Sequence, residues 1–177
     1  MLAICLLVCP GLTDQPARAE PPTFGPYDVR SAFYVSKSEN QNQVHYGVRV
    51  DEACRPQKER PVFGYWRRLK KGVRKDEPLE GPGRHLYGAS DDQAVTPGST
   101  GGVIRMFVKA AKKVKIEIRI EKTDAGCKAT SYTTIQGTPA RLTYAFLQLT
   151  RFGLGVKYVE LVGTRASDGA RVSEQVR

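Results

Sequence analysis

Residues 113–121 read KVKIEIRIE, and this stretch decides the fold class. Its charged residues alternate with four apolar ones, Val114, Ile116, Ile118 and Ile120. In an extended chain, alternate side chains point to opposite faces, so the apolar residues share one face. A helix would scatter the isoleucines around its circumference. The stretch therefore predicts a half-buried β-strand with its apolar face in the core.

The same period of two recurs along the chain. In residues 44–50, VHYGVRV, the apolar residues share one face, and His45 and Arg49 take the polar face. Residues 32–36 read as the hairpin partner of this strand, joined through polar residues at 39–42. Residues 140–152 also match a helical stripe, but their Thr and aromatic content and their neighbours favour a strand. Further strands are predicted at 62–70, 103–109, 128–135, 141–149, 156–164 and 171–176.

These strands predict an all-β protein built as a single antiparallel β-sandwich or barrel of eight or nine short strands. Residues 20–30 hold three prolines and read as an extended lead-in, so the β-rich domain covers 31–177. The longest irregular stretch is a Gly/Pro-rich loop at 76–102. Long loops on all-β scaffolds often carry binding function.

The N-terminus predicts export. Residues 2–12 are an apolar run of signal-peptide length, too short to span a bilayer, and Ala17-Arg18-Ala19 suits signal peptidase. We expect residues 1–19 to be cleaved and the protein to be periplasmic or extracellular, with no transmembrane segment after cleavage. The alternative is that the apolar run is a buried N-terminal strand.

Of the four cysteines, Cys54 and Cys127 would remain after cleavage. Two cysteines in an oxidising compartment read most simply as one disulfide. The alternatives are a reactive thiol or half of a metal site. Because the sequence has only two histidines, it offers few side chains that could bind a metal ion, and neither a metal nor a cofactor is expected.

Lys and Arg number 28 against 18 Asp and Glu, a net charge of +10, so an anionic partner is expected. Residues 55–75 concentrate this charge, with nine basic residues against Glu59 alone. The interleaved aromatic residues suggest a platform for an anionic envelope polymer or a membrane surface; nucleic acid is not expected. The alternative is a solvated basic face that discourages edge-to-edge aggregation. The candidate binding residues are Tyr65, Trp66, Arg67, Arg68, Lys70 and Lys71, with His85 and Tyr87 from the Gly/Pro-rich loop.

The sequence holds no GxSxG, no HExxH and no phosphate-binding Gly-rich loop. Sets such as His85, Ser90 and Asp91 or Asp92, or the carboxylate pair Glu77 and Asp91, lack a geometric reason to be chosen. We therefore expect a non-catalytic binding or structural module of the envelope. Two alternatives stay open. One is an envelope-polymer hydrolase that uses the 76–102 loop, and the other is a barrel-type carrier of a small apolar ligand.

Several short stretches resemble a known family. They are residues 33–40 with 42–46, Gly64-Tyr65-Trp66 with its basic tail, Leu86-Tyr87-Gly88, and residues 157–163 followed by Asp168-Gly169 and 172–174. The resemblance is to uncharacterised, often exported bacterial domains catalogued only as a domain of unknown function, the DUF4833-like family. It implies a single all-β domain over about 30–177. It brings no activity, cofactor or catalytic residue. Ser36-Lys37 departs from the family pattern, in which a basic residue is expected one place earlier.

Overall fold

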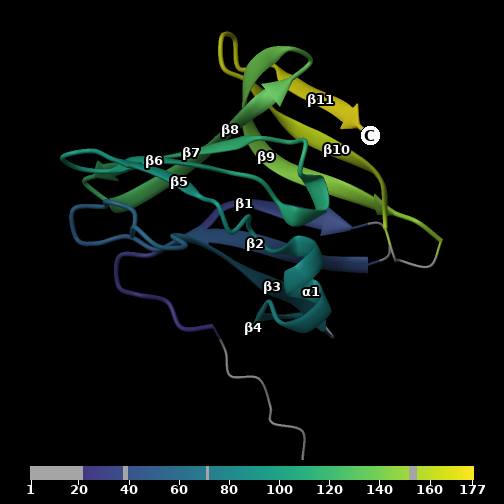
Figure 1. Cartoon of the computed structure of the whole chain (residues 1–177), viewed down its shortest axis with the longest axis horizontal. Coiled ribbons are helices and arrows are strands. Elements are labelled where there is room, and N and C mark those ends of the chain that lie inside the picture. The colour runs from purple at the N-terminus through teal and green to yellow at the C-terminus, as the bar shows by residue number, and fades with distance from the viewer. Residues whose placement is uncertain (1–21, 38–39, 71, 152–154) are drawn as a thin grey trace, which may run out of the picture.

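The predicted strand at 113–121 forms strand β7, which begins at Ile116 and lies in one continuous sheet (Figure 1). A computed structural model describes residues 22–37, 40–70, 72–151 and 155–177. The predicted signal peptide at 1–19 and the first residues of the lead-in lie outside these ranges. The strands are β1 (Val29–Lys37), β2 (Asn40–Val48), β3 (Val62–Lys70), β4 (Val73–Pro78), β5 (Ala94–Pro97), β6 (Gly102–Met106), β7 (Ile116–Thr123), β8 (Gly126–Ile135), β9 (Thr138–Leu149), β10 (Val156–Arg165) and β11 (Arg171–Val176). Two short helices, α1 (Gly81–Tyr87) and η1 (Lys109–Ala111), interrupt them.

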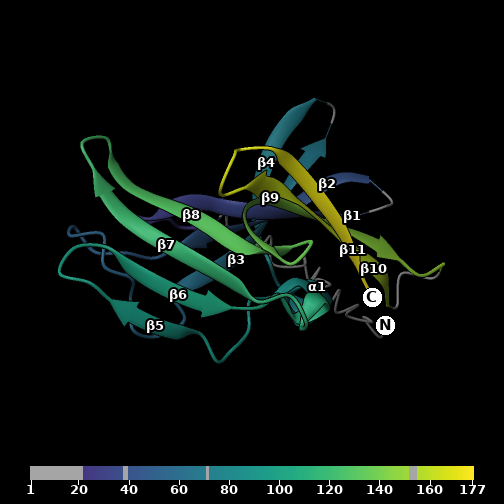
Figure 2. The ribbon, with the colours of Figure 1, turned by 90° about the horizontal axis from the view of Figure 1, so that it is seen from above.

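The sheet runs in the order β4-β3-β2-β1-β9-β8-β7-β6-β5, and β10 joins it by pairing with β9 and β11. Strand β9 has 12 residues, long enough to pair with β8 through its first part and with β1 through its second. The β1–β9 pairing is parallel, whereas the other strand pairs are antiparallel. Figure 2 shows β5 to β8 as one wing of the sheet, beside the wing formed by β1 to β4.

The all-β prediction is confirmed, and the sheet is not closed. Its path ends at β4 on one side and β5 on the other. The carrier alternative requires a closed sheet around an open interior, and this arrangement does not supply one. Instead, the apolar faces of the two wings meet in one buried cluster, which contains Phe33 and Tyr46 from one wing and Ile104 and Ile118 from the other. The architecture is therefore sandwich-like, with a filled core.

The period-two pattern placed most core residues correctly. Val114, Ile116, Ile118 and Ile120 are at most 6% exposed, although Val114 precedes the strand. The segment that also matched a helical stripe is a strand as predicted, over Thr138–Leu149, and residue 152 lies outside the described residues. The turn before it is Gln136–Gly137, where both residues have positive φ, as a two-residue type I′ hairpin requires.

The Gly/Pro-rich stretch 76–102 is less irregular than predicted, because it contains the end of β4, helix α1 and β5. Helix α1 has a proline in its first turn, where the missing N–H costs no hydrogen bond. Packing then stabilises a segment whose glycines disfavour a helix. The Tyr87 ring is buried, and its carbonyl accepts a 2.6 Å hydrogen bond from the Tyr46 hydroxyl. Tertiary contacts therefore decide this helix.

Cys54 and Cys127 form the predicted disulfide, with their Cα atoms 5.3 Å apart. The bond ties the loop after β2 to the start of β8. Two hydrogen bonds to backbone carbonyls of the same loop accompany the disulfide: the Gly101 N–H donates to the Ala53 carbonyl, and the Lys122 side-chain Nζ donates to the Glu52 carbonyl. No helix in the described part of the chain has the length and apolar character that a membrane span needs.

Candidate functional site

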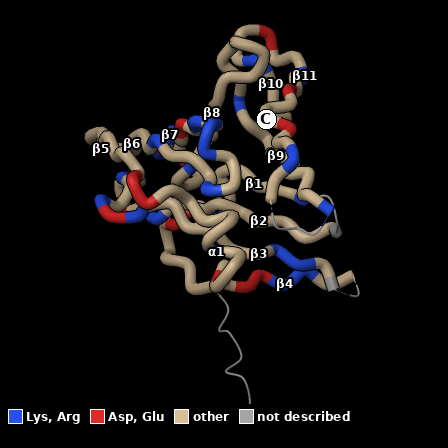
Figure 3. The backbone as a smooth tube through the Cα atoms, turned by 45° about the vertical axis from the view of Figure 1, so that its right-hand side comes forward, with Lys and Arg blue, Asp and Glu red and all other residues tan. Residues whose placement is uncertain are grey.

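The β3–β4 hairpin divides the predicted binding residues between the two faces of the sheet. Because side chains alternate along β3, Tyr65 and Arg67 share one face while Trp66 and Arg68 share the other. Figure 3 shows the basic stretch of β3 beside a β4 that carries both acidic and basic residues. The residues of the sequence-predicted platform are therefore divided between the two faces of the hairpin. Lys70 is placed only as the last residue of β3, and Lys71 lies outside the described residues.

One face carries a row of rings across four neighbouring strands. Tyr65 of β3, His45 of β2, Tyr34 of β1 and Tyr144 of β9 lie opposite one another in the strand register. Their centroids are 5.6, 5.3 and 5.3 Å apart in turn, and the rings are nearly parallel. Cross-strand aromatic pairs of this kind stabilise a sheet. The His45 and Tyr34 rings each stack on a neighbouring ring through both faces, so these two inner rings offer only their edges to a ligand.

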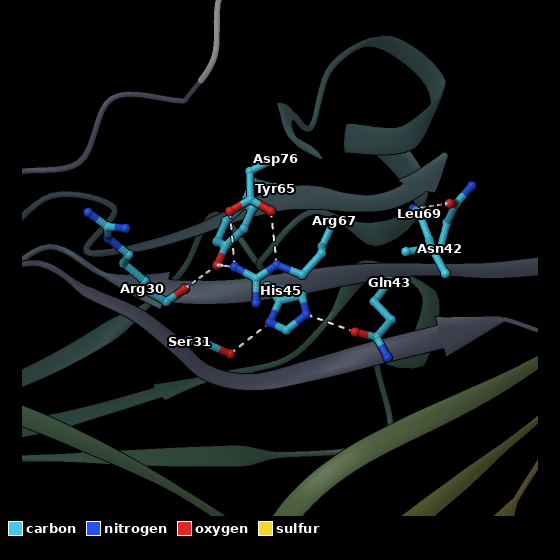
Figure 4. A network of polar contacts seen from close by, with 9 residues as sticks. All are labelled: Arg30, Ser31, Asn42, Gln43, His45, Tyr65, Arg67, Leu69 and Asp76. Atoms are coloured by element: carbon cyan, nitrogen blue, oxygen red, sulfur yellow. Dashed lines mark hydrogen bonds and ion pairs between the residues drawn. The ribbon is translucent and has the colours of Figure 1, made fainter. Parts of the chain in front are cut away.

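His45 is a buried inner member of this row, although the sequence predicts it on the polar face of a half-buried strand. It is 6% exposed. Its Nδ1 lies 2.8 Å from the Ser31 hydroxyl and its Nε2 lies 2.9 Å from Gln43 Oε1 (Figure 4). Burial, with a smaller contribution from the Arg67 charge, lowers the pKa of His45 to about 4. The ring is therefore neutral at pH 7.

The Ser31–His45–Gln43 chain resembles a nucleophile, a base and an orienting group, and the sequence analysis did not find it. Since Gln43 Oε1 can only accept, the proton lies on Nε2 and Nδ1 accepts from Ser31. A base with a pKa near 4 activates a serine poorly at neutral pH. The chain of hydrogen bonds therefore serves to orient the ring. Its members meet only through the β1–β2 register, which no local motif signals.

Arg67 lies beside the ring row and is held by two partners. Its Nε and Nη2 atoms contact the two carboxylate oxygens of Asp76 at 2.9 and 3.0 Å. Nη2 also donates to the Tyr65 hydroxyl at 3.1 Å, and that hydroxyl donates to the Arg30 carbonyl at 2.8 Å (Figure 4). The Arg67 hydrogen bonds hold the pKa of Asp76 below its usual value. Arg67 is thus a fixed guanidinium rather than a mobile surface charge.

A groove of about 350 Å³ follows this edge of the sheet, and we call it the arginine groove. Arg74 lies on β4, opposite Leu69 in the register. Among the described residues no carboxylate pairs with Arg74, and the groove's charged lining consists of arginines alone. A second hollow, which contains Phe24, adjoins it and shares Arg67 and Arg74. The arginine groove is lined by Ser36, Gln41, Gln43, Arg67, Arg68, Leu69 and Arg74.

The opposite face of the hairpin holds the other predicted residues. The Trp66 and Tyr87 rings meet edge to face at 5.5 Å, and the Arg68 guanidinium lies over Trp66 while pairing with Glu77 at 2.8 Å. Tyr87 is 5% exposed, so it supports Trp66 instead of offering a surface. The sequence places His85 in the Gly/Pro-rich loop. It is instead an exposed residue of α1, and the described part of the chain gives it no hydrogen-bond partner.

Ser90 and Asp91 line one hollow, but His85 does not join them there. Ser90 is 1% exposed, and its hydroxyl accepts the Phe107 N–H. Asp91 is solvent-exposed and pairs with Lys109 at 2.8 Å. Among the described residues no hydrogen bond or ion pair joins His85 to Ser90 or Asp91. Glu77, which was considered as a carboxylate partner of Asp91, forms ion pairs with Arg68 and Lys75. In the described ranges no group of three or more His, Cys, Asp or Glu side chains is arranged to hold a metal ion.

Comparison with known proteins adds one finding. A family model described as "Domain of unknown function (DUF4833)" matches residues 33–175. No curated protein and no solved structure matches the chain. The match covers β1 to β11 almost completely, and so includes both the ring row and the arginine groove.

Proposed function

Because the chain belongs to the DUF4833 family, whose description assigns no activity, we propose a function from its geometry: an exported, non-catalytic module of the cell envelope that binds an anionic polymer in the arginine groove. The observation that carries the proposal is the lining of this groove. Its charged residues are arginines, and one of them, Arg74, has no carboxylate partner among the described residues.

The groove combines a fixed and an available guanidinium. Arg67 is already oriented by Asp76 and Tyr65, so holding it against a ligand costs little additional side-chain entropy. Arg74 is exposed and can turn its planar donors to a phosphate, sulfate or carboxylate group. Both arginines line two adjoining hollows, so an extended polyanion can contact them from either side.

The uncharged lining also suits a polar polymer. Ser36, Gln41 and Gln43 offer hydroxyl and amide groups beside the arginines. These groups can donate to and accept from the backbone of a sugar or polyol phosphate chain. None of the four rings of the ring row lines the groove, and the faces of the inner rings are already stacked on their neighbours. Recognition is therefore electrostatic and polar rather than aromatic.

Export is supported by the residues at the start of the sequence and by the cysteine pair. The apolar run at 2–12 with Ala17-Arg18-Ala19 suits a cleaved signal, and the disulfide suits an oxidising compartment. Sequencing the N-terminus of the protein recovered from the periplasm or the medium tests this part. A chain that begins at Glu20 is expected, and a retained residue 1 would contradict export by cleavage.

The binding proposal is tested with polyphosphate as the probe and Arg74→Glu as the variant. Wild-type binding should weaken steeply between about 0.1 and 1 M salt, because the Debye length falls from about 10 to about 3 Å. Arg74→Glu should weaken it at least tenfold. The matched control is Arg171→Glu, which makes the same charge change at an exposed residue of β11. Equal losses in both variants would show diffuse attraction without a site and would overturn the proposal.

Two further probes separate the partner classes. Polygalacturonate, a carboxylate polymer, tests whether the groove needs phosphate, and vesicles with anionic lipid test a membrane surface. Binding of either soluble polymer that depends on Arg74 supports the proposal. Binding to vesicles alone would contradict it in favour of a membrane surface.

A further inference from the structure

A third hollow shares no lining residue with the arginine groove, and its lining differs in kind. It has a volume of about 290 Å³ and lies where η1 and the residues after it approach the first residues of β10 and the last of β11. We call it the η1 pocket. In Figure 2 the C-terminal end of β11 lies beside this segment. Lys113 Nζ donates a 2.9 Å hydrogen bond to the Arg177 main-chain oxygen across it.

The floor of the η1 pocket is apolar. Val114 and Val159 are buried at its base, and Val156 and Val176 are half-buried at its sides. Ala111 of η1 completes the floor without filling it. The valine and alanine side chains of the floor offer no hydrogen bond, so they favour an alkyl group over water or a sugar, and Tyr158 is the one uncharged polar side chain of the lining.

The rim is basic. It carries five basic residues and, among the described residues that line it, no acid. One of the five, Lys109, pairs with Asp91 at 2.8 Å. Like charges gathered around an apolar hollow attract an anion and focus its approach. The rim residues are Lys109, Lys112, Lys113, Lys157 and Arg177.

We infer that the η1 pocket binds a single-chain anionic amphiphile, with its carboxylate or phosphate head on the basic rim and the first part of its alkyl chain on the valine floor. The apolar floor and the basic rim each argue against a simpler ligand. A small inorganic anion would leave the apolar floor exposed to water, and a neutral hydrocarbon would leave the charges of the rim residues Lys112 and Lys157 uncompensated. A volume near 300 Å³ is at the small end of ligand sites, so the far end of a long chain extends outside.

The inference does not rest on the arginine groove. The two sites share no lining residue and occupy different parts of the sheet. The Arg74→Glu variant should therefore bind the amphiphile as the wild type does, while the rim variants should still bind polyphosphate. Failure of either proposal leaves the other testable.

The test uses dodecanoate below its micellar concentration, with binding followed by calorimetry on the full-length exported protein. We expect saturable one-to-one binding, and at least tenfold weaker binding in the Lys112→Glu/Lys157→Glu double variant. Both lysines are exposed, so the fold should persist, as thermal unfolding would show. The matched control is Lys128→Glu/Arg171→Glu, the same charge change at exposed positions away from the pocket.

Two ligand controls and one packing variant complete the experiment. Acetate and dodecanol should each bind at least tenfold more weakly than dodecanoate, because each lacks one half of the recognised structure. Ala111→Leu, which fills the floor, should weaken dodecanoate binding without changing the charge. Absence of saturable binding, an equal loss in the control variant, or binding to anionic vesicles without binding of monomeric dodecanoate would overturn the inference.

Discussion

Arg67 and Asp76 lie opposite each other in the β3–β4 register and form a bidentate ion pair, with N–O distances of 2.9 and 3.0 Å. Both side chains are about a quarter exposed. Arg67 also reaches the Tyr65 hydroxyl, so the pair joins the edge hairpin to the ring row. Asp76 of β4 therefore fixes the orientation of the Arg67 side chain on the neighbouring basic strand β3.

Asp76→Asn should lower the free energy of unfolding by about 1–2 kcal/mol, because the charge-assisted hydrogen bonds to Arg67 are lost in a partly buried place. Urea unfolding measures the change. The matched control is Asp91→Asn, whose carboxylate pairs with Lys109 in an exposed position and should give no measurable loss. Equal effects of the two substitutions would contradict a special role for the Arg67–Asp76 pair.

Stability should fall as the pH is lowered from about 6.5 to about 4, because the folded His45 has its pKa lowered to about 4. In this window the unfolded chain binds the proton and the folded chain does not, so acid favours unfolding. The loss from this group is at most about 3 kcal/mol, reduced by solvent screening, and is complete below pH 4.

The charged groups that act on His45 are Arg67, Arg74 and Asp76, while Ser31 and Gln43 hydrogen-bond its ring. His45→Phe keeps a stacked ring and removes the titration. Urea midpoints at pH 7 and 4.5 should differ for the wild type and agree more closely for this variant. The same pH dependence in both proteins would assign it to other groups. Asp76, with its lowered pKa, adds a further loss that begins as the pH falls through the usual titration range of an aspartate and continues below it.

Ile118→Ala should cost about 2–5 kcal/mol, since the side chain is fully buried between the two wings of the sheet. Lys115 lies three residues before Ile118 and is exposed, so Lys115→Ala should change the free energy of unfolding by less than about 0.5 kcal/mol. Denaturant unfolding of both variants makes the comparison. Equal, small effects would show that the register of β7 is wrong.

Reduction of the Cys54–Cys127 disulfide should destabilise the protein by about 4 kcal/mol, because the bond closes a loop with a sequence separation of 73. Unfolding with and without a thiol reductant measures the loss. Mass spectrometry of non-reduced peptides should recover the two cysteines linked. Two alkylatable thiols in the native protein would refute the bond, and a Cys54→Ser/Cys127→Ser variant as stable as the oxidised wild type would refute its contribution.

The strands could be predicted because their signal is local. Alternation of Val and Ile with charged residues predicts the strand at 113–121 from a few residues, and β3 and β11 have the bounds 62–70 and 171–176 that the sequence predicted. Helix α1 could not be predicted in the same way. Its glycines and proline oppose a helix locally, and burial of Tyr87 beneath Trp66 outweighs that preference.

The candidate sites depend on strand order, which the local pattern does not contain. The residues 55–75 could be recognised as basic from the sequence, but whether each charge is available depends on Asp76 and Glu77, which lie across the hairpin. His45 reads as polar by alternation, yet it is buried because Tyr34 and Tyr65 lie opposite it on neighbouring strands. The η1 pocket brings Lys112 and Lys157 to one rim from distant parts of the chain. Period and turn chemistry therefore decide where strands form, while the pairing of strands far apart in sequence decides which charges are neutralised, which rings stack and where a hollow remains.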